Sequence, residues 1–441
     1  MRSSHTLARM ETTFDEPNLV PNAGLVAPAA LAQQLGVAEL IDEHVRLPDD
    51  AAGRANVGTK AMTVIGAMLA GADSIDDVDV LRAGAAPELF DQIRAPSTIG
   101  TWLRGFIWAT VRMLDAVSRR VLARAWQAGL GPDLDAELTI DFDSTICQVF
   151  GTAKQGARFG YTKVRGYHPL LATLADTGEV LHARMRGGNA GAARGAGSFV
   201  RETIRRVRDA GAIGGLTVRA DSAFYSKAFI GACRAHHAKF SVTVRLNKAI
   251  RTAIDAIPED AWVPIEYWLN GGADVAETTY TAFKGTDDEI TLRLIVRRVR
   301  PTPGSQLALD VVFDYHALLT DRDGDMLEVE ADHRAHAVIE QTIRDLKAGG
   351  LAHVPSGKFA ANAAWLGLAV LAHNLGRWTL KAAGPEWERA TVATLQTKLV
   401  AMPARLVHTG RRLKLRAPTR WPWRQTFEAA LARIAAIPAP T

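Results

Sequence analysis

The sequence is poor in cysteine and has no long hydrophobic run. Its 441 residues include 2 cysteines, Cys147 and Cys233, which cannot build a disulfide framework, so we expect a reducing environment. No apolar stretch reaches the roughly 18 residues of a membrane-spanning helix. The N-terminal segment, with Glu11, Asp15 and Glu16, lacks the apolar core of a signal peptide. These absences predict a cytoplasmic protein without a membrane segment.

The sequence also lacks a large excess of charge of one sign. Its 52 basic and 47 acidic side chains give a net charge of +5, so binding to a polyanion would have to come from local clusters. The strongest cluster lies in residues 405–424, which contain no acid and are interleaved with Trp421 and Trp423. Its basic members, predicted to contact DNA phosphates, include Arg411, Arg412, Lys414, Arg416 and Arg420.

The hydrophobic fraction of 48% and the charged fraction of 22% are typical of a globular chain of two or three domains. Residues 1–132 are rich in alanine and leucine and predict a helical N-terminal domain. Residues 133–258 and 326–385 predict the two parts of an α/β core, and the aromatic and β-branched residues 259–325 predict an antiparallel β insertion between them. Residues 386–441 form a basic C-terminal tail region.

The core is predicted from alternating and helical patterns. Three strands, a helix, a strand, a helix and a strand are expected in that order, at 138–143, 168–174, 179–185, 198–210, 216–221, 225–236 and 240–246. The insertion is expected to contain strands at 274–283, 290–299 and 309–319. Two helices are expected after it, at 333–347 and, as an almost wholly apolar core helix, at 360–380.

Four acidic residues are candidates for chemistry. Asp141 and Asp143 lie on the polar face of the first strand, Asp221 ends a later strand, and Glu340 lies on the helix after the insertion. Converging carboxylates are costly unless a divalent cation neutralises them. Hard oxygen ligands, and the lack of cysteine or histidine at zinc spacing, favour Mg²⁺ or Mn²⁺ over zinc.

The helix around Glu340 is basic on the same face. His333, His336, Arg344 and Lys347 stand at −7, −4, +4 and +7 from the glutamate, which suits a metal-bound phosphate backbone. The alternative interpretation is an amphipathic helix with a solvated face and a surface pair between Glu340 and Arg344.

These motifs resemble those of the DDE transposases of bacterial insertion sequences, in particular the insertion-sequence-four superfamily and its thirteen-eighty branch. The resemblance covers residues 135 to 380. It rests on Asp141 to Thr145, Gly160-Tyr161, Gly166 to Leu170, Gly188-Asn189, Arg219 to Ser222 and the Glu340 helix. In that superfamily tyrosine, arginine, glutamate and lysine are separated by two, three and six residues. Here that spacing selects His333, His336, Glu340 and Lys347, so both leading positions are histidine.

The resemblance implies a ribonuclease H-like catalytic core and metal-dependent cleavage and strand transfer of DNA. It implies that Asp143, Asp221 and Glu340 hold Mg²⁺ or Mn²⁺, with two ions expected. Asp143, two residues before Thr145, is favoured as the first acid, with Asp141 as a second ligand or the alternative. Lys347 and Arg344 would hold phosphates near the cut. The implied partners are transposon-end and target DNA, bound by a homodimer, with the N-terminal domain as a probable DNA-binding unit.

Two alternatives remain open. Asp141, Asp143 and Thr145 also fit the signature of haloacid-dehalogenase-like phosphatases, in which Asp141 would be a covalent nucleophile and Asp143 the acid/base. That interpretation requires a doubly wound parallel sheet, whereas a hairpin is expected after the first strand. The other alternative is a catalytically decayed transposase that still binds DNA.

Overall fold

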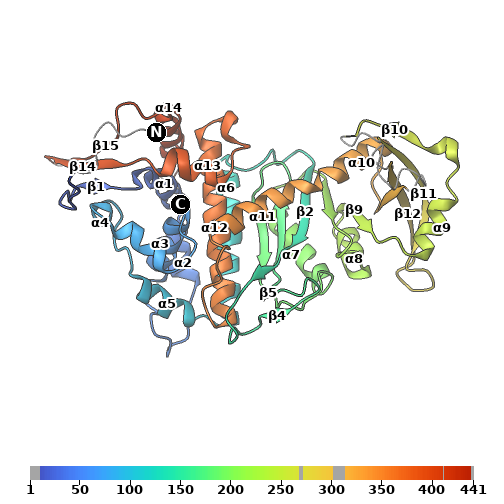
Figure 1. The fold of residues 1–441 in the computed structure, drawn as a ribbon, viewed down its shortest axis with the longest axis horizontal. Helices are drawn as coiled ribbons and strands as arrows, with labels where there is room; N and C mark the ends of the chain where they lie inside the picture. Colours follow the sequence, from blue (N-terminus) through green and yellow to red (C-terminus); the bar gives the residue numbers. More distant parts are fainter. Residues whose placement is uncertain (1–9, 268–271, 301–312, 411, 439–441) are drawn as a thin grey trace.

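The computed structural model describes residues 10–267, 272–300, 313–410 and 412–438. A helical region, a large mixed sheet and an extension of that sheet follow one another along the long axis of the molecule (Figure 1). Arg411 and positions 309–312 of the predicted third insertion strand lie outside the described residues. Within the described residues no single helix is long and apolar enough to span a bilayer, and one bent pair, Ala23–Gln34 with Val37–His44, passes that test by length and composition only.

The central sheet has nine strands in the order β10-β11-β12-β13-β9-β8-β2-β6-β7. Its core strands are β2 (Leu138–Ser144), β6 (Leu170–Leu174), β7 (Val180–Arg184), β8 (Leu216–Ala220) and β9 (Lys239–Val244). Strands β2, β8 and β9 run parallel. On the other side of β2, β6 pairs antiparallel with it, and β7 pairs antiparallel with β6. The predicted order of core strands and helices is confirmed.

One face of β2 is packed with aromatic rings, which leaves the opposite face for polar groups. Phe142 meets Phe199 of α7 (Ala196–Asp209) and Phe229 of α8 (Lys227–Ala235) edge to face, with ring centroids 5.8 and 5.9 Å apart. Because side chains alternate along a strand, the odd-numbered residues of β2, among them Asp141 and Asp143, lie on the other face. Helices α7 and α8 therefore bury the apolar side of the sheet and leave the acids to be covered from the other side.

The segment predicted as a β insertion does form antiparallel strands, but they continue the central sheet. They are β10 (Val263–Ile265), β11 (Ala273–Ala282), β12 (Ile290–Val299) and β13 (Asp314–Thr320). Strand β13 pairs antiparallel with β9, so the sheet extends without a break from the core to the end of the molecule (Figure 1). The long-range pairing of β13 with β9 decides this, and nothing in the local sequence pattern specifies it.

Helix α12 (Phe359–Ala383) is the buried helix predicted at 360–380. It contacts α3 (Val57–Leu69), α6 (Trp108–Gln127) and β7, so it lies between the helical region and the sheet (Figure 1). Asn374 accepts a hydrogen bond from the Val180 amide at 2.8 Å and donates one to the Val180 carbonyl at 2.9 Å. The helix thereby satisfies backbone groups on β7 at the edge of the sheet, where they would otherwise be unpaired.

The chain beyond 386 is folded against the N-terminal region rather than extended as a tail. Strand β1 (Leu19–Val20) pairs with β14 (Ala404–Thr409), which pairs with β15 (Arg412–Arg416). Helix α14 (Arg424–Ala435) contacts α1 (Val26–Gln34) and α12. The segments nearest the two ends of the chain thus form one unit around α12 (Figure 1).

Candidate active site

Asp143 and Asp221 come together because two neighbouring parallel strands carry them in matching positions. Strands β2 and β8 pair with Asp141 opposite Arg219 and Phe142 opposite Ala220. The next position on each strand is occupied by Asp143 and Asp221. Neighbouring strands lie about 4.8 Å apart, so these two carboxylates share one face of the sheet at its carboxyl edge. The Asp221 carboxylate also accepts a hydrogen bond from the Ala223 amide at 3.0 Å.

Glu340 joins them from a helix that crosses the polar face. It lies in the first turn of α11 (Ile339–Ala348), which contacts β2. The predicted single helix over 333–347 is wrong. The structure has α10 (Met326–Arg334), a 3₁₀ segment at Ala335–Val338 and then α11. The tighter 3₁₀ turn changes which way the side chains point, so His333, before the turn, and His336, within it, do not continue the face of α11.

The pKa of Asp143 reflects the proximity of Asp221 and Glu340. Burial raises the pKa of its carboxyl group to about 6, against the hydrogen bond from the Ser144 amide at 2.6 Å, which lowers it. The charges of Asp221 and Glu340 raise the pKa of Asp143 further, and His336 lowers it. A carboxyl group whose pKa is raised by neighbouring carboxylates is suited to bind a divalent cation, which would relieve the repulsion.

Asp141, two residues earlier on the same strand, is in a different environment. Its side chain is fully buried, and Arg219 donates to both of its oxygens, from Nε at 2.7 Å and from Nη2 at 2.8 Å. His336 lies 2.9 Å from the same carboxylate through Nδ1. Arg219 also donates to the Asp332 carboxylate at 2.9 Å. The negative charge of Asp141 is therefore compensated by Arg219. The next facing positions on β2 and β8 hold two acids, Asp143 and Asp221.

Two further histidines frame the acids. His168 donates from Nδ1 to the Ala190 carbonyl at 2.7 Å, so its Nε2 accepts from the Ser144 hydroxyl at 2.9 Å. His333 contacts the Ser241 and Thr243 hydroxyls at 2.8 and 2.9 Å. Burial, with His336 and Arg219, lowers the pKa of His333 to about 3. Its neutral ring therefore serves to connect α10 to β9.

The basic residues of the predicted site lie on two surfaces. Arg344 and Lys347 are exposed on α11, one and two turns beyond Glu340, and no ion pair joins Glu340 to Arg344 in the part of the chain that the structure describes. Arg412, Lys414 and Arg416 are exposed at alternate positions of β15, and Arg420 is exposed after it. The second surface belongs to the unit around the chain ends, away from the acids (Figure 1).

The tightest group of potential metal ligands lies elsewhere, between α6, β7 and α7. Among the described residues, one set of three has ligand atoms all within 4.8 Å of one another: Asp115, His182 and Glu202. Asp143, Asp221 and Glu340 are thus spaced more widely than that. No motif in the sequence indicates this cluster, since its three members come from separate elements.

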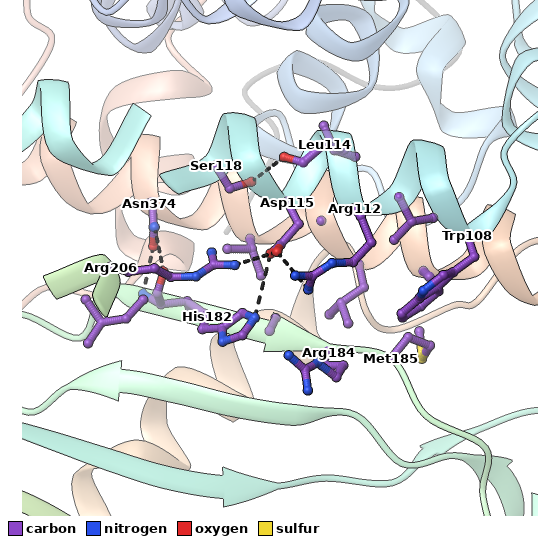
Figure 2. A pocket seen from close by; sticks show the side chains of 18 residues that line it. Trp108, Arg112, Leu114, Asp115, Ser118, His182, Arg184, Met185, Arg206 and Asn374 are labelled. Carbon is purple, nitrogen blue, oxygen red and sulfur yellow. Dashed lines mark hydrogen bonds and ion pairs between the residues drawn. The ribbon is translucent and has the colours of Figure 1, made fainter. Parts of the chain in front are cut away.

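Arginines already neutralise that cluster. Arg206 and Arg112 bind Asp115 at 2.5 and 3.3 Å, Arg112 also binds Glu202 at 3.1 Å, and Arg184 binds Glu202 at 2.8 Å, as Figure 2 shows in part. Burial and these three arginines hold the pKa of His182 well below its usual value, so its ring is neutral. Three cations against two carboxylates leave net positive charge, and a divalent cation would be repelled. The cluster joins α6 to the sheet.

A sequence profile described as "Transposase DDE domain group 1" matches residues 3–439, almost the whole chain. The chain belongs to this DDE transposase family. Membership supports an enzyme that cleaves and transfers DNA. The family also implies that the enzyme uses a divalent metal and has DNA as its partner. No curated protein matches the sequence significantly.

The DDE transposase also resembles a solved transposase structure. That structure is a "Cryo-EM structure of piggyBac transposase synaptic complex with hairpin DNA", 14% identical in sequence, with a TM-score of 0.39; the match covers 86% of this chain and 80% of that one. The structure also contradicts the phosphatase alternative. The sheet of this transposase is mixed rather than doubly wound parallel, and Asp141, the required nucleophile, is closed off by Arg219.

Proposed function

We propose that this transposase cleaves the ends of an insertion sequence and joins them to target DNA, with Asp143, Asp221 and Glu340 as its catalytic acids. We place it in the thirteen-eighty branch of the insertion-sequence-four superfamily. The observation that carries the proposal is the contrast between adjacent positions of β2 and β8. The buried pair Asp141 and Arg219 is neutral, whereas Asp143 lies near Asp221 and Glu340, and no ion pair within the described residues involves any of these three acids.

The strand order β7-β6-β2-β8-β9, in which only β6 runs opposite to the other four strands, with helices after β7 and β8, supports a ribonuclease H-like core. In such a core the acids stand at the carboxyl edge of the two central parallel strands and on a following helix. Here β2, β8 and α11 supply these positions. The continued sheet, β13 to β10, then fills the chain between the second and the third acid.

The residues present fit a site for two Mg²⁺ or Mn²⁺ ions. Asp143, Asp221 and Glu340 offer the oxygen ligands that these ions prefer. When bound, such ions would supply activation of the attacking hydroxyl or water and stabilisation of the leaving oxygen. The Ser144 amide fixes the orientation of the Asp143 carboxylate, and the Ala223 amide fixes that of Asp221.

The surrounding residues position the DNA. Arg344 and Lys347 follow Glu340 at i+4 and i+7 on α11, so their charges lie on the same side of that helix and can hold phosphates next to the scissile bond. Because an element has two ends and each chain has one set of acids, we propose that a homodimer acts on the DNA. The N-terminal helical region is proposed to bind the ends.

The reaction is tested on the DNA that flanks this reading frame. We expect the purified protein to cut the end DNA with Mg²⁺ or Mn²⁺ and to leave it intact with a chelator, because the acids repel one another and the phosphate unless a cation is present. The products are separated on a denaturing gel. A protein that binds the end DNA but cuts none of it with either ion would be a decayed transposase, and the catalytic proposal would be refuted.

The basic strand β15 is proposed to bind the DNA backbone. Changing Arg412, Lys414 and Arg416 together to glutamine should weaken binding and reduce the slope of log K against log salt by up to about 3, since each lost phosphate contact contributes about 0.9. Fluorescence anisotropy at several salt concentrations measures this slope. The matched control changes Arg245, Lys248 and Arg251, which are exposed near α9 (Lys248–Asp255) at the far end of the molecule. An unchanged slope in the β15 variant would exclude this strand from the DNA surface.

A further inference from the structure

A small sheet beside the proposed active site exposes aromatic rings. It consists of β3 (Cys147–Gln148), β5 (Arg165–Tyr167) and β4 (Arg158–Phe159). Phe150, Phe159 and Tyr161, in and next to these strands, are 86%, 67% and 80% exposed. A single exposed ring is common on protein surfaces, but three on one small sheet are typical of a binding surface.

Tyr161 contacts a histidine that lies next to the proposed catalytic acids. Its ring centroid is 6.0 Å from that of His168. His168 in turn accepts the hydrogen bond from Ser144, the neighbour of Asp143, and the charge of Asp221 reaches its ring. Tyr161 is therefore connected to Asp143 through the side chains of His168 and Ser144, and most of its side chain is open to solvent.

A cavity rich in arginine lies on the backbone side of His168. Its volume is about 410 Å³, and Arg184, Arg186, Asn189 and Arg194 are among the residues that line it. Arg186 donates from Nε to the His168 carbonyl at 3.0 Å, while its Nη2, which is out of contact with solvent, has no hydrogen-bond partner among the described residues. Burial and the charges of Arg184 and Arg194 lower the pKa of Arg186 to about 10.

The positive charge of this cavity is only partly compensated. Arg184 is paired with Glu202 at 2.8 Å, but no ion pair within the described residues involves Arg186 or Arg194. Helix α7 begins next to Gly195, at the edge of the cavity, and its first turn has neither an acidic residue nor a side-chain cap. The Nε and Nη1 groups of Arg186 are bound to backbone carbonyls, so the cavity offers a phosphate the Nη2 group of Arg186, the exposed guanidinium group of Arg194 and the N–H groups at the start of α7.

Glycines hold the aromatic sheet against the loop that carries the cavity. A Cβ atom on Gly188 would lie 2.2 Å from the Gly166 carbonyl oxygen and 2.3 Å from that of Arg158. A Cβ atom on Gly160 would lie 2.5 Å from the carbonyl oxygen of Gly188. Only glycine allows this contact between backbones, so the position of Tyr161 relative to the arginine cavity is fixed by the fold.

We infer that this surface holds one unpaired nucleotide of the DNA end, with its base stacked on Tyr161 and its phosphate bound by Arg186 and Arg194. The bases of a duplex are stacked on one another, so an exposed ring can stack only on a base that has left the helix. The inference rests on the proposed function, because it names the form of DNA that lies next to the catalytic acids.

The experiment uses the full chain and a short duplex whose single-stranded extension contains 2-aminopurine, with a chelator present so that nothing is cut. Stacking should quench the 2-aminopurine, and the extended duplex should bind more tightly than the blunt one. Tyr161→Ala should abolish the quenching and weaken binding about 5- to 150-fold, the range of base stacking on aromatic residues. Tyr161→Phe, which keeps the ring, should preserve both.

Arg194 tests the phosphate half of the site. Because its side chain is exposed and has no ion pair among the described residues, Arg194→Ala should leave the fold intact and reduce the salt slope by about 0.7, the value for one contact to a single strand. Arg389→Ala, at another exposed arginine without an ion pair in the described part of the chain, is the control.

Quenching and affinity that survive in Tyr161→Ala, or equal binding of blunt and extended duplexes, would overturn the inference. If the wild-type protein shows metal-dependent cleavage at the same time, the nucleotide site alone has failed. If no metal-dependent cleavage occurs but binding of the extension depends on Tyr161 and Arg194, the proposed reaction has failed and the nucleotide site stands.

Discussion

Asp221→Asn and Glu340→Gln should each lower the rate of metal-dependent cleavage at least about 1000-fold. The amide keeps the shape of the side chain and removes the charge that holds the cation. The stabilisation of the transition state lost with a catalytic metal amounts to several kcal/mol, and each 1.36 kcal/mol corresponds to a factor of ten in rate. The rate is measured in single turnover on end DNA, with Mg²⁺ in excess.

The binding of end DNA in a chelator should be unchanged or slightly stronger in both variants, because a negative charge near the phosphates has been removed. Asp260→Asn, at an exposed acid in the extension of the sheet, is the matched control and should cleave at the wild-type rate. Wild-type cleavage by both Asp221→Asn and Glu340→Gln would show that the reaction takes place elsewhere on the protein.

Asp141→Asn should destabilise the protein strongly, whereas Asp143→Asn should not. Asp141 is fully buried and bound by both Nε and Nη2 of Arg219, which is itself 2% exposed. Breaking a buried ion pair leaves a charge without its partner and costs about 3–5 kcal/mol. Unfolding in urea, followed by circular dichroism, measures the loss. Asp141→Leu combined with Arg219→Met should recover most of it.

The pH dependence distinguishes Asp143 from its neighbour. Because the pKa of Asp143 in the folded protein is raised to about 6, the folded state holds its proton more tightly than the unfolded chain does. In a chelator, the contribution of this residue to stability therefore falls as the pH rises from about 4 to about 6 and stays low above that. Asp143→Asn should remove this fall and abolish cleavage. If Asp143→Asn unfolds the protein while Asp141→Asn stays folded and inactive, the roles of the two residues are reversed.

The core of the fold could be predicted because its signals are local. Alternation along 138–143 and 216–221 placed aspartates at the ends of two strands, and the hairpin at 168–185 and the apolar helix at 360–380 follow from equally short patterns. The choice between Asp141 and Asp143 as first acid needed the register. In the parallel pair of β2 and β8, Asp141 lies opposite Arg219. Two residues further along both strands, Asp143 therefore comes next to Asp221, so one aspartate has a cation as its neighbour and the other has an acid.

Other features could not be predicted because their causes are distant in the sequence. The pairing of β13 with β9 decides whether the later strands form a separate unit or continue the sheet. The 3₁₀ segment at Ala335–Val338 contains neither glycine nor proline, so no local residue marks the break in the helix. The ion pairs that join Asp115 to Arg206, and Glu202 to Arg112 and Arg184, arise only when α6, β7 and α7 pack together.

The pairing of β1 with β14 has a consequence for the order in which the protein matures. Val20 lies opposite Ala404, so the first strand has no partner until the ribosome has added almost all of the chain. Contacts this far apart in sequence form late, since a long loop must close before they are made. A product that ends before residue 404 would lack Ala404 and Leu406, which share a buried apolar cluster with Val20 and Ala23, and we expect such fragments to aggregate or to be degraded.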